Sequence, residues 1–341
     1  MRLPEPVLPV LRGGPVLRWG VLAPGFIAAK FVEALHEHTD QEVIAVASRS
    51  LERAEQFARF HGIAQAFGSY ERLVADTPVD IVYVAAPHTE HKRLALLAIA
   101  AGKHVLVEKP LAVTAADARD IAEAAQAAGV FAMEALHSRF HPRISVIEQV
   151  LAGGDLGEVT LATADLSVGF AVDRGSRIYN PALAGGAMLD LGIYPVWFAR
   201  LALGQPAGIV AFGRRAETGV DAQVSAILTS SGGAQASIAT SILSYTSGHA
   251  SINGTRGRIF VDGRHHLPGG LTVFGAKNEV IAEFRDESGI ERMHGLCRQA
   301  AWVARHVADG LRDSPLHPLA ASIELLETID AIRGQVAYPI P

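Results

Sequence analysis

The stretch His104-Val-Leu-Val-Glu-Lys-Pro110 is the part of the sequence that says most about the fold. Its three apolar residues, 105–107, predict a short strand that is buried on both faces. Pro110 has no N–H for a sheet ladder, so the strand should end there and leave Glu108 and Lys109 at one edge of the sheet. Ligands of open α/β sheets bind at the carboxyl ends of the strands. This edge is therefore a candidate site, and a solvated Glu–Lys ion pair is the alternative.

Lysine is rare in this chain, with five lysines against 25 arginines, so Lys109 calls for an explanation. The sequence around it alternates short apolar runs with amphipathic segments. We expect strands at 16–22, 42–48, 66–67, 81–85, 104–107 and 131–134, with helices at about 26–37, 51–61, 70–75, 91–101 and 115–128. This order predicts an α/β fold, a doubly wound parallel (Rossmann) sheet, over residues 16–136.

The pattern changes after residue 137. Helices are expected at 142–151, 187–203, 292–311 and 319–334, a strand at 159–166, and five or six strands without intervening helices from 209 to 284. Strands that follow one another without crossovers favour an antiparallel sheet. Residues 137–341 are therefore expected to form an α+β domain for substrate binding and dimerisation, with a large, mainly antiparallel, open sheet. Its final helix could pack back on the Rossmann domain, and residues 1–15, with four prolines, should be a flexible lead-in.

The composition limits the possible partners. A net charge of −5 without a basic cluster argues against nucleic acid and anionic membranes. The apolar segment 94–101 is far shorter than the ~20 residues of a membrane span. The single cysteine, Cys297, excludes an intramolecular disulfide and fits a reducing cytoplasm. A soluble, cytoplasmic protein that acts on a small molecule is expected.

A turn between the first strand and the first helix, Gly20-Val-Leu-Ala-Pro-Gly-Phe-Ile-Ala28, is placed to hold a dinucleotide pyrophosphate. Its candidate contacts are Gly20, Ala23, Gly25, Phe26 and Ile27. It departs from the glycine fingerprint, because Ala23 holds the first glycine position and Ala28 the third. An ordinary βα turn is the alternative.

The end of the second strand indicates which dinucleotide binds. An NAD site has Asp or Glu there for the ribose 2′-hydroxyl, whereas this chain has Ser48 and Arg49, with Arg53 one turn later. A hydroxyl and guanidinium groups suit a 2′-phosphate, so NADP(H) is favoured over NAD(H). The alternative is a solvated basic helix start.

Two histidine-bearing segments are candidate ligand contacts. Pro87, His88 and His91 follow the fourth strand at the cofactor edge, although a loop histidine more often packs or lies on the surface. The pair His265-His266 lacks further metal ligands nearby and is interpreted as surface. No metal site is expected.

In the second half, Gly185-Gly-Ala-Met-Leu-Asp-Leu-Gly-Ile-Tyr194 combines a glycine pair with Asp190 and Tyr194. These two residues are four apart, so they share one helix face. The glycines allow close backbone approach. A tyrosine and a lysine together could move a proton at a substrate oxygen while a hydride moves at carbon. A buried Asp that caps backbone and a core Tyr are the alternative.

These segments resemble the glucose–fructose oxidoreductase/inositol dehydrogenase (Gfo/Idh/MocA) family over nearly the whole chain. The resemblance rests on the turn at 20–28, on Ala-Gly-Lys-His-Val-Leu-Val-Glu-Lys-Pro at 101–110 and on the 185–194 segment. Ser48-Arg49, the segment 138–142 and Tyr194 point to the branch of the dimeric dihydrodiol dehydrogenases and NADP-dependent D-xylose dehydrogenases.

The resemblance implies roles for particular residues. Lys109 would orient the substrate hydroxyl and the cofactor, beside Glu108, and Tyr194 would be the acid/base. Asp190, Arg177 and Asn180 would lie in the substrate pocket, and the Lys109–Pro110 peptide would be cis. It also implies a homodimer or higher oligomer formed through the open face of the second sheet. The departures are Ala23, His137 in place of an aromatic residue, and Asn180 in place of an acid.

The sequence therefore predicts an NADP(H)-dependent oxidoreductase that acts on a CH–OH or carbonyl carbon of a sugar, polyol or trans-diol. One rival hypothesis is a cofactor-binding sensor without turnover, which would need neither Lys109 nor Tyr194. Another is a reductase of a non-sugar substrate. The pocket around His137, Arg177 and Asn180 would decide between these hypotheses.

Overall fold

The computed structural model describes residues 1–336, and the chain divides into two compact units. The Rossmann unit comprises Leu8–Phe140 and Arg292–Ile323. The large-sheet unit comprises Met1–Val7, His141–Glu291 and the described residues from Glu324 onward. The chain leaves the Rossmann unit between Phe140 and His141, beside the boundary expected at 136/137, but it returns to that unit after residue 291.

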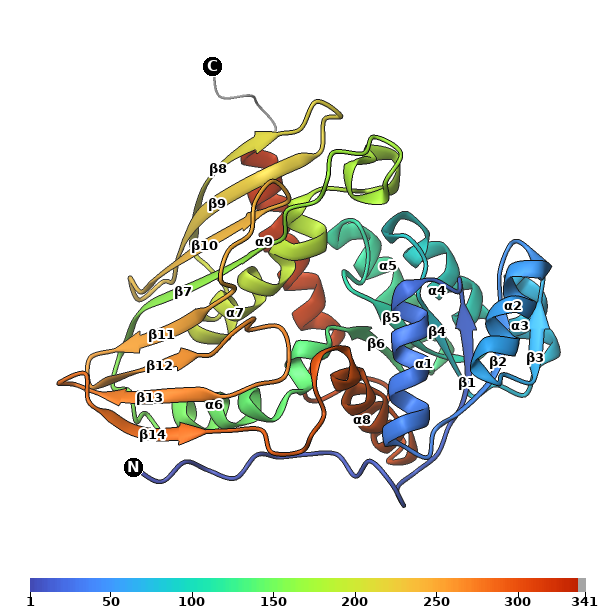
Figure 1. The fold of residues 1–341 in the computed structure, drawn as a ribbon, viewed down its shortest axis with the longest axis horizontal. Coiled ribbons are helices and arrows are strands. Elements are labelled where there is room, and N and C mark those ends of the chain that lie inside the picture. Colours follow the sequence, from blue (N-terminus) through green and yellow to red (C-terminus); the bar gives the residue numbers. More distant parts are fainter. Residues whose placement is uncertain (337–341) are drawn as a thin grey trace. The chain divides into compact units, whose positions relative to one another are not determined.

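The Rossmann unit is built on six parallel strands in the order β3-β2-β1-β4-β5-β6 (Figure 1). The strands are β1 (Arg18–Leu22), β2 (Glu42–Ala47), β3 (Gln65–Phe67), β4 (Ile81–Val84), β5 (His104–Glu108) and β6 (Ala132–Ala135). The doubly wound prediction is confirmed. The order changes direction between β1 and β4, where such sheets bind ligands.

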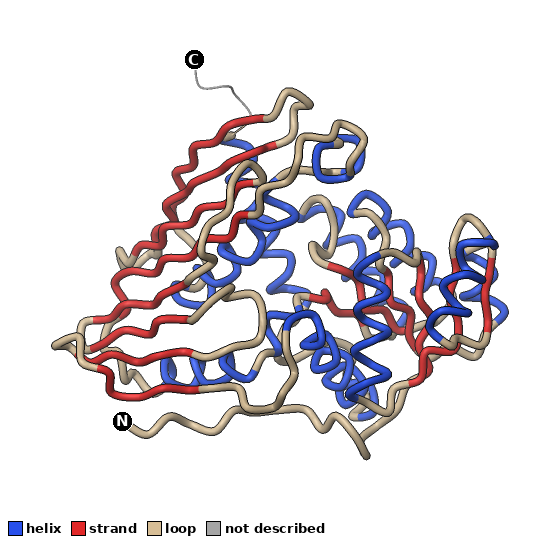
Figure 2. Tube along the Cα trace, in the orientation of Figure 1, coloured by secondary structure: helices blue, strands red, loops and turns tan. Residues whose placement is uncertain are grey.

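Helices alternate with these strands along the chain (Figure 2). They are α1 (Phe26–His38), α2 (Leu51–His61), α3 (Tyr70–Asp76), α4 (His91–Ala100) and α5 (Ala115–Ala128). Ser50, Ser69 and Thr114 cap α2, α3 and α5 with side-chain oxygens. A further helix, α8 (Leu296–Ala308), packs on α1 from the far end of the sequence. Periodicity alone could not assign α8 to this unit.

The large-sheet unit holds eight strands in the order β14-β13-β12-β11-β7-β10-β9-β8. They are β7 (Val159–Ser167), β8 (Gly208–Arg215), β9 (Asp221–Thr229), β10 (Gln235–Ser241), β11 (Ala250–Gly254), β12 (Gly257–Val261), β13 (Leu271–Gly275) and β14 (Val280–Phe284). Only the β7–β10 pair is parallel, so the mainly antiparallel prediction is confirmed. Where five or six strands were expected between residues 209 and 284, the structure has seven, β8–β14. The sequence signal of β11 is weak because Ser, Asn and Gly are poor strand formers.

One face of this sheet is covered and the other is open. Helix α7 (Ile193–Leu203) packs on β7 and β10, and α6 (Pro142–Ala152) and most of α9 (Leu319–Gln335) belong to the same unit. The first turn of α9, residues 319–323, belongs to the Rossmann unit. Strand β9 alternates buried and exposed residues, as expected of a half-covered strand.

Residues 1–15, expected to be a flexible lead-in, make specific hydrogen bonds. In the large-sheet unit, the Val7 N–H donates to Ser145 Oγ at 2.9 Å and the Gln149 amide donates to the Glu5 carbonyl at 3.0 Å. In the Rossmann unit, the Gly13 N–H donates to the Asp40 carboxylate at 2.6 Å. The prolines correctly predict that this segment has no regular secondary structure. They carry no information about the distant side chains that form hydrogen bonds with it.

One helical stretch, Pro181–Leu203, is long and apolar enough to cross a membrane by length and composition. In the structure, 83% of its most apolar window is buried inside the protein. It is therefore a core segment of a folded unit.

Candidate functional site

The carboxyl end of β5 carries a buried carboxyl group beside Lys109. Glu108 is 6% exposed, accepts from the Tyr83 hydroxyl at 2.5 Å and accepts from the Lys109 N–H at 3.2 Å. Burial raises the pKa of Glu108 to about 7. The alternative of a solvated ion pair therefore fails for Glu108. Lys109 is half-buried, and its peptide bond to Pro110 is cis, as the resemblance implied.

His91 fixes the backbone next to Lys109. It is fully buried, with Nδ1 2.8 Å from the Pro110 carbonyl oxygen and Nε2 2.9 Å from the Ala86 carbonyl oxygen. Burial lowers the pKa of His91, and a neutral imidazole can donate to only one of these two oxygens. Both ring nitrogens face backbone, so His91 positions the loop after β4 against the residue that follows Lys109.

His88 and Pro87 lie one turn earlier in that loop. His88 is 6% exposed and lines a cavity of about 370 Å³ together with Lys92, Arg93 and Asp117. The sequence placed Pro87, His88 and His91 at the cofactor edge, and all three do follow β4. Their side chains differ, since Pro87 is half-buried while both histidines are buried.

His137 lies close to Lys109 in the Rossmann unit. It is 2% exposed, and burial, together with the Lys109 ammonium, lowers its pKa to about 3. The His137 imidazole beside Lys109 is therefore neutral throughout the physiological pH range. The sequence marked His137 as a departure from the resembling family and as part of the pocket with Arg177 and Asn180, but nothing in the local pattern placed it beside Lys109.

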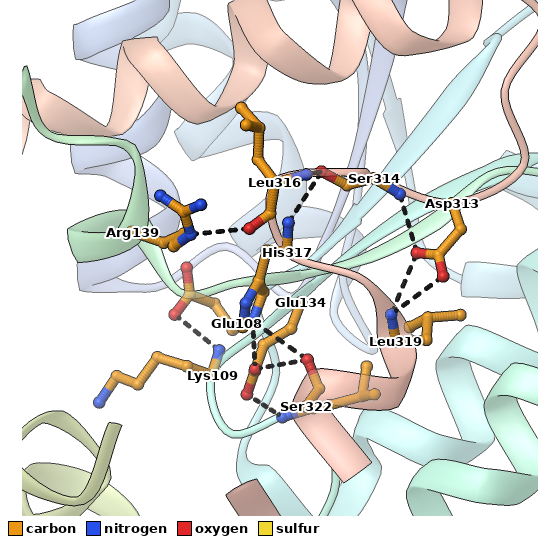
Figure 3. A network of polar contacts seen from close by, with 11 residues as sticks. Glu108, Lys109, Glu134, Arg139, Asp313, Ser314, Leu316, His317, Leu319 and Ser322 are labelled. Carbon is orange, nitrogen blue, oxygen red and sulfur yellow. Dashed lines mark hydrogen bonds and ion pairs between the residues drawn. The ribbon is translucent and has the colours of Figure 1, made fainter. Parts of the chain in front are cut away.

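A second buried carboxylate, Glu134 on β6, joins the chain beyond Lys109 to the C-terminal part of the unit (Figure 3). Its Oε1 accepts from the Leu111 N–H at 2.8 Å, and its Oε2 lies 2.9 Å from His317 Nε2 and 2.8 Å from Ser322 Oγ. These partners hold the pKa of Glu134 below its ordinary value although burial opposes them. Figure 3 shows the Lys109 side chain pointing away from this cluster. Sequence reasoning missed the network, because Glu134 and His317 are 183 positions apart.

The turn before α1 fits a dinucleotide. Ala23 adopts φ 67°, the left-handed conformation of a fingerprint glycine, which costs a non-glycine residue about 1 kcal/mol or more. Gly25 is the N-cap of α1 and supplies no capping side chain, so the first N–H groups of α1 remain for an anion. A Cβ on Gly25 would meet no atom closer than 4.0 Å, which leaves open space at the position where backbone approaches a pyrophosphate.

The other residues of this turn differ in role. Phe26, at the start of α1, is 73% exposed and Ile27 is half-buried. Gly20 lies inside β1, where a Cβ would come within 2.8 Å of Leu73 Cδ2. A side chain at position 20 would therefore push against the Leu73 side chain of α3, so Gly20 favours the close packing of α3 on β1 whether or not a cofactor binds.

Ser48 and two arginines lie at the end of β2, as the sequence indicated. The Ser48 hydroxyl accepts weakly from the Ser50 N–H at 3.3 Å. Arg49 and Arg53 are exposed, and their charges oppose the rise that burial causes in the pKa of Tyr70. Two exposed guanidinium groups thus follow the buried Ser48 at the end of β2. A hydroxyl together with guanidinium groups suits a phosphate.

In the large-sheet unit, the expected substrate residues Arg177 and Asp190 form an ion pair of 2.8 Å. Asp190 lies in a π-helical turn, Met188–Gly192, which leads into α7. Such π-turns are frequent at functional sites. A Cβ on Gly185 would lie 2.5 Å from the Arg177 carbonyl oxygen, so the predicted close backbone approach is present. That glycine lets the Arg177 turn reach Asp190.

Tyr194, in the first turn of α7, is 5% exposed, and its ring lies 4.8 Å from the ring of His266. The prediction that His265-His266 lies on the surface is wrong. His265 is fully buried and contacts the Gly248 carbonyl oxygen at 3.1 Å, and burial lowers its pKa to about 4. The Gly/Pro-rich surroundings suggested a surface loop, but the loop packs on α7.

Asn180 has a local structural contact. Its Oδ1 accepts from the Ala182 N–H at 2.9 Å and so caps the turn Pro181–Leu183.

The site residues predicted from the sequence fall into two sets, one in each unit. Glu108, Lys109, the β4 loop and the α1 turn belong to the Rossmann unit, whereas Arg177, Asn180, Asp190 and Tyr194 belong to the large-sheet unit.

Comparison with known proteins gives a consistent result. Residues 17–136 match the family model described as "Oxidoreductase family, NAD-binding Rossmann fold", and residues 144–260 match the "GFO/IDH/MocA C-terminal domain". Among curated proteins, the trans-1,2-dihydrobenzene-1,2-diol dehydrogenase of Sus scrofa is 37% identical over 335 residues, covering 95% of this chain and 98% of that protein. The human enzyme of the same name is 36% identical over 335 residues, with the same coverage.

Solved structures share the fold. A 3-ketoreductase from Actinomadura kijaniata in complex with NADP and TDP-benzene superposes with a TM-score of 0.83 at 26% identity, covering 95% of this chain and 99% of that one. A levoglucosan dehydrogenase with NADH and levoglucosan has a TM-score of 0.83 at 20% identity, covering 94% and 97%. The latter likeness shows the fold alone.

Proposed function

Because the chain belongs to the Gfo/Idh/MocA family of oxidoreductases, we propose that it transfers a hydride between NADP(H) and a CH–OH or carbonyl carbon of a sugar, polyol or trans-diol. The observation that carries the proposal is the carboxyl end of β5, where a half-buried Lys109 sits beside the buried Glu108 and the neutral His137. Two ionisable groups with strongly shifted pKa values, Glu108 and His137, beside one lysine are typical of a functional site. The nicotinamide supplies the hydride chemistry, and the chain supplies binding, orientation and proton transfer.

In this proposal Lys109 holds the substrate oxygen and Tyr194 relays its proton. His91 and Glu134 act on Lys109 only indirectly, because His91 contacts the Pro110 carbonyl and Glu134 binds the Leu111 N–H. They are positioning residues. The N-terminus of α1, with Ala23, Gly25, Phe26 and Ile27, holds the pyrophosphate.

The substrate pocket includes Asp190 and Arg177, with Asn180 in the adjoining turn. A carboxylate that is already paired with a guanidinium at 2.8 Å is fixed in orientation, which suits hydrogen bonding to a substrate hydroxyl. The relatives named for trans-1,2-dihydrobenzene-1,2-diol favour a vicinal diol, and a sugar offers the same pair of neighbouring hydroxyls.

NADP(H) is proposed over NAD(H) because of the residues after β2. Ser48, Arg49 and Arg53 offer a hydroxyl and two guanidinium groups where an NAD site has an acid. We further propose a cytoplasmic protein that assembles as a homodimer or higher oligomer through the open face of the large sheet. Neither nucleic acid nor membrane is a proposed partner.

Kinetics of lysine and tyrosine variants test the proposed chemistry. Lys109→Ala and Tyr194→Phe are each expected to lower kcat for diol or sugar oxidation by about 100-fold or more, because Lys109 holds the substrate oxygen and Tyr194 transfers its proton. Binding of NADPH, followed by fluorescence, should stay within a few-fold in Tyr194→Phe. Lys277→Ala and Tyr245→Phe, at exposed positions, are the matched controls and should keep wild-type rates.

Unchanged turnover in Lys109→Ala would remove Lys109 from the mechanism. Cofactor binding without turnover by the wild type on a broad panel of sugars, diols and their carbonyl products would instead support the sensor hypothesis.

A further inference from the structure

Three metal-ligating side chains meet where the end of α1 contacts the turn Arg292–Gly295, which precedes α8. They are Glu37 and His38 from the last turn of α1, and His294. The ring atoms His38 Nε2 and His294 Nδ1 are 2.9 Å apart. Oxygens of the Glu37 carboxylate lie 3.5 Å from the first of these nitrogens and 3.4 Å from the second. All three residues belong to the Rossmann unit.

This cluster has about the size of one face of a tetrahedral metal site. Zinc bonds of 2.0–2.1 Å to nitrogen or oxygen place neighbouring ligand atoms about 3.3 Å apart in a tetrahedron. The two ring nitrogens are 2.9 Å apart, and they lie 3.5 and 3.4 Å from the Oε1 and the Oε2 of Glu37, on either side of that value. One ligand atom from each of the three residues lies within 4.8 Å of the other two. The two imidazoles now share one hydrogen bond, so one ring donates and the other accepts. A metal ion would replace the shared proton with only small side-chain movements.

We propose that Glu37, His38 and His294 bind one four-coordinate transition-metal ion of the zinc class, with water as the fourth ligand. Two imidazoles and one carboxylate suit Zn²⁺ and leave one position open. The two histidine side chains are only 19% and 32% exposed, so the contact between α1 and the 292–295 turn already orients them. The Glu37 side chain is 60% exposed, which leaves the site accessible from solvent.

The charges around the site permit a cation. Arg12 and Arg298 act on His38 with positive charge. Arg12 is itself paired with the Asp40 carboxylate at 3.3 Å, and its other nitrogen donates to the Glu37 carbonyl oxygen. The Glu37 carboxylate opposes both arginines. Binding must displace the proton of the imidazole pair, so affinity should fall as the pH drops below the histidine range.

The expected consequence is stabilisation of the Rossmann unit. His38 and His294 are 256 positions apart in the chain, and a shared ion would fasten α1 to the segment that leads into α8. A ligand that binds only the folded state raises stability by mass action, so Tm should rise with the Zn²⁺ concentration. Helix α1 also begins at the dinucleotide turn, so the ion would hold the far end of the helix that receives the cofactor.

Metal titration of the untagged full-length chain tests the site. After chelator treatment and dialysis, one equivalent of Co²⁺ should give the visible absorption of a tetrahedral complex, and Zn²⁺ should displace it. His38→Ala and His294→Ala should abolish the absorption and the rise in Tm that Zn²⁺ causes. The matched control is His36→Ala, an exposed histidine in the same helix turn, which should behave as wild type.

Glu37→Gln tests the site even if the histidine variants misfold, because it changes an exposed side chain. It should weaken Zn²⁺ binding about tenfold or more. Absence of a tetrahedral Co²⁺ spectrum in the wild type overturns the proposal. So does a spectrum that survives in both folded histidine variants. Neither result bears on the hydride transfer, which is measured separately.

Discussion

Two buried glutamates, Glu108 and Glu134, differ in charge because different groups surround their carboxyls. Glu108 and Glu134 lie on adjacent strands, and both are almost inaccessible to solvent. Glu108 has a tyrosine hydroxyl and one backbone N–H as donors, and burial dominates, so its pKa rises to about 7. Glu134 has His317, Ser322 and the Leu111 N–H, which together hold its pKa low. Near neutral pH, Glu108 is partly protonated while Glu134 is ionised.

The pH dependence of unfolding should therefore differ between Glu108→Gln and Glu134→Gln. Unfolded Glu108 ionises near 4.5 but the folded carboxyl only near 7. The wild type thus loses stability relative to Glu108→Gln as the pH rises between these values, by up to ~3 kcal/mol. Glu134 has the opposite sign, so the wild type loses stability relative to Glu134→Gln as the pH falls below about 4.5. Urea unfolding at a series of pH values measures both slopes, and equal slopes would contradict this account.

The arginines after β2 give a second prediction for single residues. Replacing Arg49 and Arg53 by alanine should weaken NADPH binding about tenfold or more, because charge-assisted contacts to the 2′-phosphate are lost. NADH, which lacks that phosphate, should bind nearly as before. Fluorescence titration of both cofactors measures the ratio, with Arg59→Ala on the exposed side of α2 as the control. Tighter binding of NADH than NADPH by the wild type would reverse the proposed preference.

Among the elements, the loop 262–270 depends on one buried side chain from α6. The Arg143 guanidinium is fully buried and donates to the carbonyl oxygens of Asp262, Arg264, Leu267 and Gly270. Burial lowers its pKa to about 10, so it stays charged at neutral pH. This loop carries His266 against the ring of Tyr194. Helix α6 therefore determines the surroundings of the proposed acid/base residue.

Arg143→Met should disrupt the loop while it preserves most of the side-chain volume. Each buried carbonyl left without a donor costs about 1–3 kcal/mol, so the free energy of unfolding should fall by at least ~3 kcal/mol. Cleavage by proteases within 262–270 should become faster, and kcat should fall because Tyr194 loses its neighbour. Arg258→Met, which removes an exposed hydrogen bond from β12 to Asn278 in the turn after β13, is the control. A loop that stays resistant to protease in Arg143→Met would show that other contacts hold it.

At the scale of the whole molecule, the open face of the large sheet carries apolar side chains. Val210 and Ile227 are directly opposed on β8 and β9, and they are 56% and 42% exposed. Phe212 follows two positions later at 65% exposure. Contiguous exposed apolar side chains on a sheet face are typical of an interface. They support the proposed assembly of identical copies through this face.

Charges placed on this face should prevent the proposed assembly. Phe212→Glu combined with Ile227→Lys is expected to convert the oligomer to a monomer, because two charges would have to be buried against apolar side chains. Light scattering after size exclusion measures the mass. Phe60→Glu, at an 80% exposed position of α2, is the control and should leave the mass unchanged. A wild-type monomer at micromolar concentration would refute the proposed assembly.

Much of the architecture was predictable because it is encoded by local patterns. Runs of two- and 3.6-residue periodicity identified both sheets, and the end of β5 placed Lys109 at the sheet edge where ligands bind. The glycine at 185 correctly indicated a close backbone approach. Each of these features depends on residues within a few positions of one another, so the sequence alone determined them.

Only the tertiary structure decided the surroundings of these residues. The sequence suggested that His91 contacts a ligand, and both of its ring nitrogens face backbone carbonyl oxygens. The sequence also suggested that His265 lies on the surface, but it is buried. The side-chain partners of Glu134, His317 and Ser322, and the carbonyl partners of Arg143 lie more than 100 positions away in the chain. Burial and charge at a given side chain depend on which distant segments pack around it. Sequence periodicity does not specify those segments, and they set the pKa values and orientations at the candidate site.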